Sequence, residues 1–253
     1  MSLLSNKNIL VVGGTGKIGE NLIKNIIANK GTVIVTSRNI EKVKKLNKKF
    51  KDMSNGSKAF VVELSKEKSI KNFMIKIKNF KIHGYVHNAY CSLSYVPVGN
   101  IPWSYWSKNA LVSLASFEKI ASTLVSNASN SFIESIVSTS SIYAVRAPQF
   151  NMYTSDMNPS PIYYGSIKAA LLNATVYLAA LWGNEGVRVN SVSPGGVLSN
   201  QKTSFLENYK KTVPLNRMVL KDEVSNAVIF LLSRKSSGIN GVNLAVDAGK
   251  IIW

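Results

Sequence analysis

The residue types and spacing that most clearly suggest chemistry are those of Tyr164 and Lys168, in the segment Tyr-Gly-Ser-Ile-Lys. The segment has a helical pattern, and residues four apart lie on the same face of a helix. An ammonium beside a phenol favours the phenolate and lowers the pKa of the tyrosine toward neutral pH. The pair could therefore act as a general acid and base, although the same spacing also occurs on ordinary surface helices.

A serine hydroxyl upstream could assist such a tyrosine. The segment Ile-Val-Ser-Thr-Ser-Ser ends at Ser141 and predicts a buried strand that finishes in two serines. A hydroxyl at the end of a strand can donate a hydrogen bond to the carbonyl oxygen of a substrate. The serine and the tyrosine together indicate carbonyl chemistry more strongly than either does alone.

A glycine-rich loop follows the first predicted strand and opens the first predicted helix. Its glycines are Gly13, Gly16 and Gly19, and Thr15, Lys17 and Ile18 lie between them. Glycines permit a tight turn and a close approach of the backbone to phosphate, and the helix N-terminus offers free N–H groups. This placement favours a dinucleotide-binding site, although a sharp turn between strand and helix favours glycine in any case.

The residues after the second predicted strand indicate which dinucleotide binds. An NAD site commonly has an acidic residue here, whereas this chain has Ser37 and Arg38, and Lys17 lies in the glycine loop. Two cations without a carboxylate suit a ribose 2′-phosphate, so the sequence predicts NADP(H) in preference to NAD(H). The alternative is that Arg38 only caps the strand edge or pairs with Glu41.

Strands and helices that alternate along the chain must position these residues. Apolar runs rich in valine and isoleucine predict strands at residues 8–12, 32–36, 59–62, 84–87, 132–137, 187–192 and 243–246. Helical patterns lie at residues 18–28, 40–49, 66–79, 105–127, 163–182 and 221–232. Longer connections are expected at residues 144–161 and 195–213, the second with a short helix near 205–211.

This alternation predicts the fold class. We expect an α/β protein with one Rossmann-type, doubly wound parallel sheet of about seven strands and helices on both faces. No repeat, low-complexity tract or linker-like segment interrupts the pattern. Residues 1–253 are therefore expected to form a single NAD(P)-binding domain.

The motifs together resemble the short-chain dehydrogenase/reductase family. They are the glycine loop, the strand-end serine, the Tyr-x-x-x-Lys pair and the segment Val-Arg-Val-Asn-Ser-Val-Ser-Pro-Gly that ends at Gly195, and the resemblance extends to Gly249. It implies an oxidoreductase that interconverts a carbonyl and a secondary alcohol by hydride transfer. It also implies that Tyr164 is the general acid/base, that Ser141 rather than Ser140 polarises the substrate oxygen, and that Lys168 holds the nicotinamide ribose.

The same resemblance assigns the remaining site residues. Asn109 would support a proton-relay water, and the alternative is an ordinary polar helix residue. Glu63 and Leu64 would lie against the adenine. The full cofactor-binding set is Gly13, Thr15, Gly16, Lys17, Ile18, Gly19, Ser37, Arg38, Glu63, Leu64, Asn88, Tyr164, Lys168, Pro194, Gly195 and Val197. No metal site is expected.

The chain departs from the family pattern at three places. The glycine loop is spaced as in the family's extended members, although the chain length fits the shorter ones. Tyr90 follows Asn88 and Ala89 where the family has glycine, which predicts that this loop is displaced from the cofactor. Ser141 and Tyr164 are separated by a longer, proline-bearing loop than usual, but a surface loop can lengthen at modest entropic cost, so we expect them to stay adjacent.

The substrate is less clearly indicated. Candidates on the two long connections are Tyr143, Arg146, Gln149, Tyr163, Gln201, Lys202, Phe205 and Lys210. Rings, cations and amides suit a polar, phosphorylated or sugar-like carbonyl or alcohol substrate, and the alternative is that they only cover loop surface. The long loop, residues 194–201 and Trp253 also resemble family members linked to bacterial surface-sugar biosynthesis of the nonulosonate type.

The composition excludes several other classes of protein. The only cysteine, Cys91, excludes a disulfide-stapled scaffold, and two histidines make a closed zinc site improbable. No apolar run is long enough to span a membrane and no signal peptide is evident, so we expect a cytoplasmic protein. The formal net charge is +18, but the lysines are spread over helical faces, so no specific nucleic-acid or membrane partner is predicted.

The resemblance also implies self-association. The predicted helices at residues 105–127 and 163–182 commonly form the family's dimer interface, so a homodimer or homotetramer is expected. The apolar C-terminal residues 251–253 could add a further contact between subunits. Two other readings stay open at this point: a non-catalytic dinucleotide-binding regulator or scaffold on the same fold, and a basic protein associated with nucleic acid.

Overall fold

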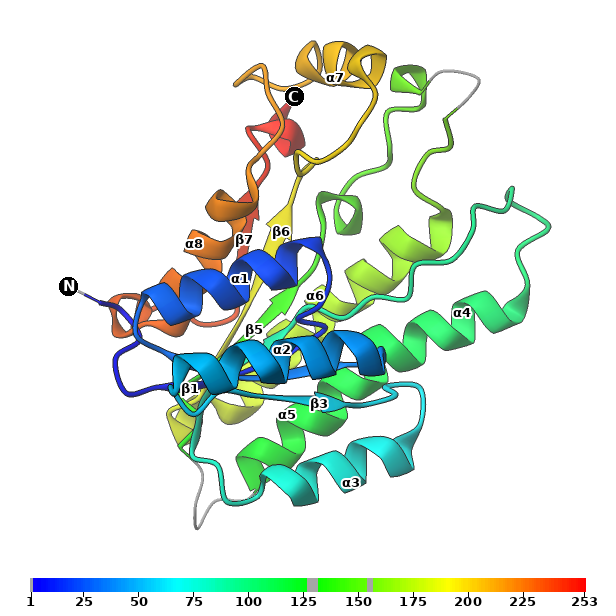
Figure 1. The fold of residues 1–253 in the computed structure, drawn as a ribbon. Helices are drawn as coiled ribbons and strands as arrows, with labels where there is room; N and C mark the ends of the chain where they lie inside the picture. Colours follow the sequence, from blue (N-terminus) through cyan, green and yellow to red (C-terminus); the bar gives the residue numbers. More distant parts are fainter. Residues whose placement is uncertain (1, 127–131, 154–156) are drawn as a thin grey trace.

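The computed structural model describes residues 2–126, 132–153 and 157–253. Within these residues the chain forms a seven-stranded sheet in the order β3-β2-β1-β4-β5-β6-β7, and all neighbouring strands are parallel (Figure 1). The strands are β1 (Asn8–Val12), β2 (Thr32–Ser37), β3 (Lys58–Val61), β4 (Ile82–His87), β5 (Ser135–Thr139), β6 (Arg188–Pro194) and β7 (Asn243–Val246). The predicted fold class is confirmed.

The strand order places the functional edge of the sheet. The chain moves outward from β1 to β2 and β3, then returns and moves the other way through β4, β5, β6 and β7. In open parallel sheets ligands bind beyond the carboxyl ends of the strands, at the point where the order reverses. Here that point lies between β1 and β4, and the glycine loop follows β1 directly.

Helices cover both faces of the sheet (Figure 1). The α-helices are α1 (Lys17–Ala28), α2 (Ile40–Met53), α3 (Glu67–Ile77), α4 (Trp103–Ala110), α5 (Ser116–Ser126), α6 (Ile162–Trp182), α7 (Thr203–Lys210) and α8 (Lys221–Leu232). Apolar residues of α1, α2 and α8 pack in one core cluster, and those of α3, α5 and α6 pack in the other. The short α7 lies beyond the carboxyl end of β6.

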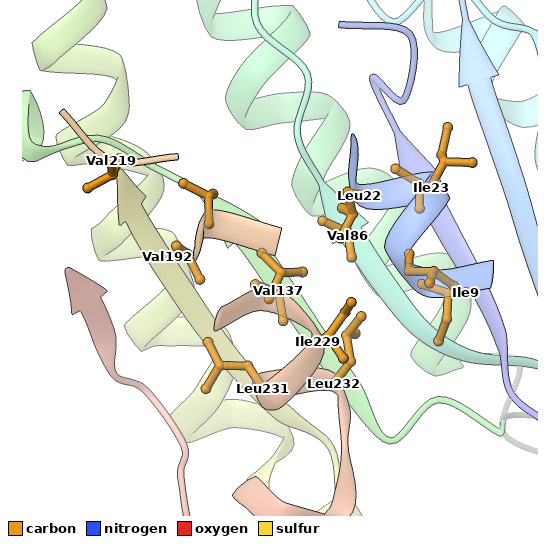
Figure 2. Packing of buried hydrophobic residues seen from close by; sticks show 14 of the residues in the cluster. Ile9, Leu22, Ile23, Val86, Val137, Val192, Val219, Ile229, Leu231 and Leu232 are labelled. Carbon is orange, nitrogen blue, oxygen red and sulfur yellow. The ribbon is translucent and has the colours of Figure 1, made fainter. Parts of the chain in front are cut away.

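The strands are buried because helices cover them on both sides. Figure 2 shows side chains of β1, β4, β5 and β6 meeting those of α1 and α8. The residues labelled there include Ile9, Leu22, Val86, Val137, Val192, Ile229 and Leu232, all of them buried. Each such side chain contributes roughly 1.5–3 kcal/mol through burial, so the two clusters supply the rigid frame on which the loops are mounted.

Several predicted boundaries needed adjustment. The helix predicted at residues 105–127 is α4, a π-helical turn at Leu111–Ala115 and α5, and Asn127 lies outside the described residues. The strand predicted at 132–137 begins at Ser135 and continues to Thr139. The additional unpaired residue of a π turn has no signature in apolar periodicity, which explains why the sequence did not indicate it.

The connection between β5 and α6 contains two short 3₁₀ turns, whereas the connection after β6 contains α7. These 3₁₀ turns are at Ile142–Ala144 and Phe150–Met152, and others lie at Gly183–Glu185, Arg234–Ser236 and Lys250–Ile252. Residues 154–156 of the first connection lie outside the described residues. Across the helices that the structure describes, none is long and apolar enough to cross a membrane.

Candidate active site

A cavity of ≈ 820 Å³ opens at the carboxyl edge of the sheet. The glycine loop lines one end, Tyr164 and Lys168 lie further along, and α7 closes the other end. Of the predicted site residues, all line this cavity except Gly19 and Asn109. The structure therefore brings together motifs that are spread from the first strand to the sixth.

Tyr164 lies in the first turn of α6, where Pro161 precedes the helix. Its phenol makes a hydrogen bond with the Ser141 side chain, even though the proline-bearing connection separates the two residues. Burial raises the pKa of Tyr164, and the hydrogen bond with Ser141 acts in the opposite direction. The two hydroxyl groups thus converge on one point of the cavity, as the sequence predicted.

The two serines at the end of β5 point in different directions. The Ser140 hydroxyl donates to the backbone oxygen of Lys168 at 3.0 Å, which fixes α6 against the strand. The Ser141 hydroxyl accepts from the backbone N–H of Tyr143 at 3.2 Å and reaches Tyr164. Ser141 is therefore the serine whose hydroxyl is available beside the phenol.

Lys168 is a buried cation, with 4% of its surface exposed. Its ammonium donates to the backbone oxygen of Thr139 at 2.5 Å and lies 5.9 Å from the ring centre of Tyr164. Burial lowers the pKa of Lys168 to about 8, because the charged form is poorly solvated there. The position and the charge of Lys168 suit it to stabilise the phenolate form of Tyr164.

Asn109 lies behind the cavity wall, fully buried at the end of α4. Its amide nitrogen donates to the backbone oxygen of Tyr105 at 3.0 Å, as on many helices. Within the described part of the chain, its side-chain oxygen has no partner, and the same holds for His87 Nε2 and the Ser113 hydroxyl. Burial, and then the charge of Lys168, lower the pKa of His87 to about 3, so this imidazole is neutral. Buried polar atoms of this kind are usually satisfied by internal water.

The glycine loop fits a pyrophosphate. A Cβ on Gly13 would lie 2.7 Å from the Ala89 Cα, and one on Gly19 would lie 2.6 Å from the Gly13 oxygen, so both positions require glycine. Gly16 caps α1 without a side-chain hydrogen bond, which leaves the N–H groups of the first turn free to meet an anion. The cradle and its donors match the chemistry of a dinucleotide phosphate.

The adenosine end of the cavity is cationic. Lys17, Arg38 and Lys42 line it, and the Thr15 and Ser37 hydroxyls join across it at 2.8 Å. The Lys42 ammonium donates to the backbone oxygen of Thr15 at 2.8 Å. The Glu41 carboxylate pairs with Lys44 rather than with Arg38, so the alternative of an Arg38–Glu41 pair is wrong.

Glu63 is the acidic residue on this side. Burial alone would raise the pKa of its carboxyl. The hydrogen bonds from Ser65 and the charges of Arg38 and Lys108 together outweigh this effect, so the pKa of Glu63 is lowered. Its carboxylate accepts from the Ser65 hydroxyl at 2.8 Å. Glu63 and Leu64 therefore border the cavity as expected, with the carboxylate engaged by its own turn.

The segment after β6 forms the opposite wall. Pro194, Gly195 and Val197 line the cavity. The Gly195 N–H donates to the backbone oxygen of Val246 at 2.9 Å, and Val197 pairs with Val219 as an isolated bridge. Backbone pairing on both sides holds this wall rigidly against the end of the sheet.

The expected displacement of the loop at Tyr90 is wrong. The Asn88 amide donates to the Gly13 oxygen at 3.1 Å, and Ala89 stays packed against the glycine loop. Tyr90 instead turns its ring onto Tyr164, with the ring centres 4.8 Å apart. A side chain at this position is tolerated because it points along the cavity and not into the backbone contact.

The substrate candidates divide into two groups. Tyr143, Gln201 and Phe205 line the cavity. Arg146, Gln149, Tyr163, Lys202 and Lys210 do not: for example, Lys210 pairs with Glu207 on the surface, and Tyr163 is buried against Tyr105 and Trp106.

Sequence reasoning missed several lining residues, and three of them carry side chains that could bind a ligand. They are Lys42, Tyr153 and Tyr209. Tyr209 could have been found, since it follows Phe205 by four positions and so shares its helical face. Lys42 could also have been found, because it lies in the first turn of the helix that follows Arg38, where a long side chain points back toward the preceding loop. Tyr153 lies in an irregular connection, where no periodicity indicates direction.

Known proteins with similar sequences and structures indicate the family to which this chain belongs. The family model described as enoyl-(acyl carrier protein) reductase matches residues 15–250. The post-translational flagellin modification protein A of Campylobacter coli is 30% identical over 264 residues, which is 98% of this chain and 99% of that protein. The L-xylulose reductase of Caenorhabditis elegans is 30% identical over 252 residues, which is 97% of this chain and 96% of that protein.

Among solved structures, a short-chain dehydrogenase from Leptospira borgpetersenii with bound NAD⁺ superimposes with a TM-score of 0.87 at 26% identity, covering 98% of this chain and 94% of that one. The chain belongs to the short-chain dehydrogenase/reductase family of NAD(P)-dependent oxidoreductases.

Proposed function

We propose that the protein interconverts a carbonyl and a secondary alcohol on a sugar derivative, with NADP(H) as the cofactor and Tyr164 as the general acid/base. The observation that carries the proposal is the hydrogen bond between Tyr164 and Ser141, beside the buried ammonium of Lys168 and in the same cavity as the glycine loop. A hydroxyl pair at one point can bind and protonate one oxygen atom.

In the direction of reduction, the Ser141 hydroxyl donates a hydrogen bond to the substrate carbonyl oxygen and polarises it. A nicotinamide held beside Tyr164 and Lys168 would supply the hydride for the carbonyl carbon. Tyr164 gives its proton to the oxygen and becomes a phenolate. Lys168 stabilises this phenolate by its charge, and oxidation follows the same steps in reverse.

The tyrosine must then recover a proton from solvent. Asn109 is suited to hold a relay water, because its side-chain oxygen is buried and has no partner within the described residues. The unpartnered Ser113 hydroxyl is one helical turn further on the same helical segment. This role for Asn109 is part of the proposal.

The cofactor would lie along the cavity from the glycine loop to Tyr164. The first-turn N–H groups of α1 would hold the pyrophosphate, with Gly13, Thr15, Gly16, Ile18 and Gly19 shaping the turn. Asn88, Glu63 and Leu64 would border the adenosine half. Pro194, Gly195 and Val197 would border the nicotinamide half, and Lys168 would hold its ribose.

The preference for NADP(H) rests on this chain's own residues. Lys17, Arg38 and Lys42 line the same end of the cavity as Ser37, and no acidic residue follows β2 directly. A dianionic 2′-phosphate would gain charge-assisted contacts there, whereas the ribose hydroxyl of NAD(H) would lack the carboxylate that usually accepts from it.

A polyhydroxylated substrate suits the far end of the cavity. Tyr143, Tyr153 and Tyr209 offer hydroxyl groups, and Phe205 adds an apolar face. The Gln201 side chain shapes this end by binding the backbone of Ser199 and Val197. The names of two relatives, an L-xylulose reductase and a flagellin modification protein, agree with a sugar-type substrate.

Self-association is proposed through α5 and α6. Val176, Tyr177 and Leu181 of α6 are exposed, and a shallow hollow lined by both helices lies beside them. Apolar surface of this kind usually marks a protein contact. A second copy of the chain is the proposed occupant, in a two-fold pairing of the two helices.

The first test replaces the phenol. Tyr164→Phe should reduce kcat by about a hundredfold or more, because general acid/base catalysis contributes roughly 10²–10⁴-fold. NADPH binding, followed by fluorescence titration, should stay close to that of the wild type. The assay uses L-xylulose and a panel of keto sugars, with Tyr95→Phe as the control for loss of a phenol outside the cavity. Undiminished turnover in purified Tyr164→Phe would contradict the assignment.

The second test uses the pH dependence of stability. The pKa of Lys168 is about 8 in the folded protein, against 10.5 for an unburied lysine. The unfolded chain therefore binds more protons between these values, and stability due to Lys168 rises with pH. Between pH 7 and 9.5 the free energy of unfolding of the wild type should gain about 2 kcal/mol over that of Lys168→Met.

Urea denaturation at both pH values measures this difference. Lys235→Met, which removes an exposed lysine, should show no such trend. A constant difference, or one that shrinks with rising pH, would mean that Lys168 does not carry a depressed pKa. Lys168→Met should also lose most of its turnover.

The third test concerns the cofactor. Arg38→Ala should weaken NADPH binding about ten- to a hundredfold, since hydrogen bonds to charged groups contribute about 1.5–3 kcal/mol. NADH binding should hardly change. Arg234→Ala, an exposed arginine outside the cavity, is the matched control. Equal weakening of both cofactors, or tighter binding of NADH by the wild type, would refute the preference.

The fourth test concerns assembly. Leu181→Arg places a charge in the proposed interface and should shift the protein toward monomer in analytical ultracentrifugation. Ile75→Arg changes a comparably exposed apolar residue on α3 and should leave the assembly intact. A monomeric wild type, or equal behaviour of the two variants, would rule out this interface.

A further inference from the structure

Lys250, near the C-terminus, is a buried lysine outside the catalytic cavity, with 1% of its surface exposed. It begins the last 3₁₀ turn, Lys250–Ile252. Within the described residues its ammonium contacts no carboxylate. Burying an ammonium without a carboxylate costs free energy of folding. Neutral oxygen and sulfur atoms around it must therefore accept hydrogen bonds from its N–H groups.

The chain turns sharply to send this side chain inward. Ala248 and Gly249 both have left-handed backbones, with φ of 59° and 85°. The Asp247 carboxylate accepts from the N–H groups of Gly249 at 2.9 Å and Ile251 at 2.7 Å, which fixes the turn. The inward direction of Lys250 is therefore built into the backbone.

The ammonium joins two segments that are distant in sequence. It donates to the Gln149 side-chain oxygen and to both oxygens of Thr212, the backbone one at 3.1 Å. The Met152 sulfur lies 3.4 Å away. Gln149 and Met152 belong to the long connection before α6, and Thr212 follows α7, so Lys250 ties these two segments to the C-terminal turn.

Arg146 strengthens the same junction from the other side. Its guanidinium donates to the backbone oxygens of Lys250 and of Trp253, the latter at 2.9 Å. Burial, together with the nearby Arg146 charge, lowers the pKa of Lys250 to about 8. The contacts thus bring the cations of Lys250 and Arg146 close together. Two like charges repel and lower the stability of the fold, so this arrangement is better explained by the positions in which it holds the two segments.

The opposite surface of these segments faces the cavity. Tyr153, next to Met152, places its hydroxyl 3.0 Å from that of Tyr143 and its ring 5.7 Å from that of Phe205. The Tyr209 ring lies 5.1 Å from the Lys250 ammonium, and the Tyr209 hydroxyl accepts from the Gly196 N–H at 2.8 Å. Lys250 therefore lies directly behind the wall that lines the substrate end.

We propose that Lys250 is a positioning residue for the substrate: by joining the Gln149–Met152 segment to the end of α7, it fixes the wall formed by Tyr153, Phe205 and Tyr209. It touches neither substrate nor cofactor. Its effect on substrate selection rests on the proposed function, whereas its effect on the wall does not. Removing the ammonium leaves the oxygens of Gln149 and Thr212 without this donor. The two segments then meet only through weaker contacts such as those of Met152 with Asn208 and Thr212, so they open locally more often.

The experiment compares Lys250→Met with the wild type by hydrogen–deuterium exchange without ligand. Methionine keeps the length of the side chain and removes its donors. Peptides from residues 147–153 and 203–213 should exchange about tenfold faster, while peptides from β1, β4 and β5 keep their protection, since local opening does not require global unfolding. Lys235→Met, at an exposed lysine, is the matched control.

A kinetic measurement separates positioning from a general structural role. With L-xylulose as the probe, KM should rise about tenfold, while kcat and the Kd of NADPH change little, because Tyr153, Phe205 and Tyr209 line the substrate end of the cavity. Lys250→Arg keeps a charged donor and should restore part of the protection. If Lys250→Met does not fold, Gln149→Ala and Thr212→Val each remove one partner and should produce the same local exchange.

The outcomes are distinct. Unchanged exchange in both segments, or an equal rise across the whole sheet, would overturn the role of Lys250. Local opening with a lowered kcat and an unchanged KM would overturn it as well. Local opening in a protein that reduces no carbonyl compound would support the role of Lys250 in the wall and contradict the proposed function instead.

Discussion

The burial of the Lys168 ammonium at the carboxyl edge of the sheet is the constraint on which the arrangement of the site depends. The charge is tolerated because the backbone oxygen of Thr139, the last residue of β5, accepts its hydrogen bond. The Ser140 hydroxyl then binds the backbone of Lys168 in return. These contacts fix the distance and rotation of α6 relative to β5, and with them the place where Tyr164 meets Ser141.

The fold could be predicted from the sequence because apolar periodicity and sheet topology are closely linked. The bounds of β1, β7 and α8 agree with the apolar runs, and the alternation of strands and helices left few topologies to consider. The Tyr164–Lys168 pair and the glycine loop could also be recognised from the sequence, because each is a local pattern whose geometry follows from one helix or one turn.

Features that depend on contacts between distant segments could not be predicted in this way. The orientation of Tyr90 is set by packing against Tyr164, and no local pattern encodes it. No pattern in the sequence singles out Lys250, yet three remote residues bury it. Arg146 and Gln149 were expected to face substrate because they lie in a connection near the site, whereas they serve the C-terminal turn behind it.

The π-helical turn between α4 and α5 changes the directions in which one continuous helix points its side chains before and after the turn. An uninterrupted α-helix would keep the directions of Asn109 and of the apolar residues of α5 in fixed relation. One additional residue offsets those directions by about 100°. The helix can therefore bury the Asn109 amide in one direction while Phe117 and Ile120 stay packed in the core, so this irregularity reconciles the direction of a proposed functional side chain with that of the packing residues.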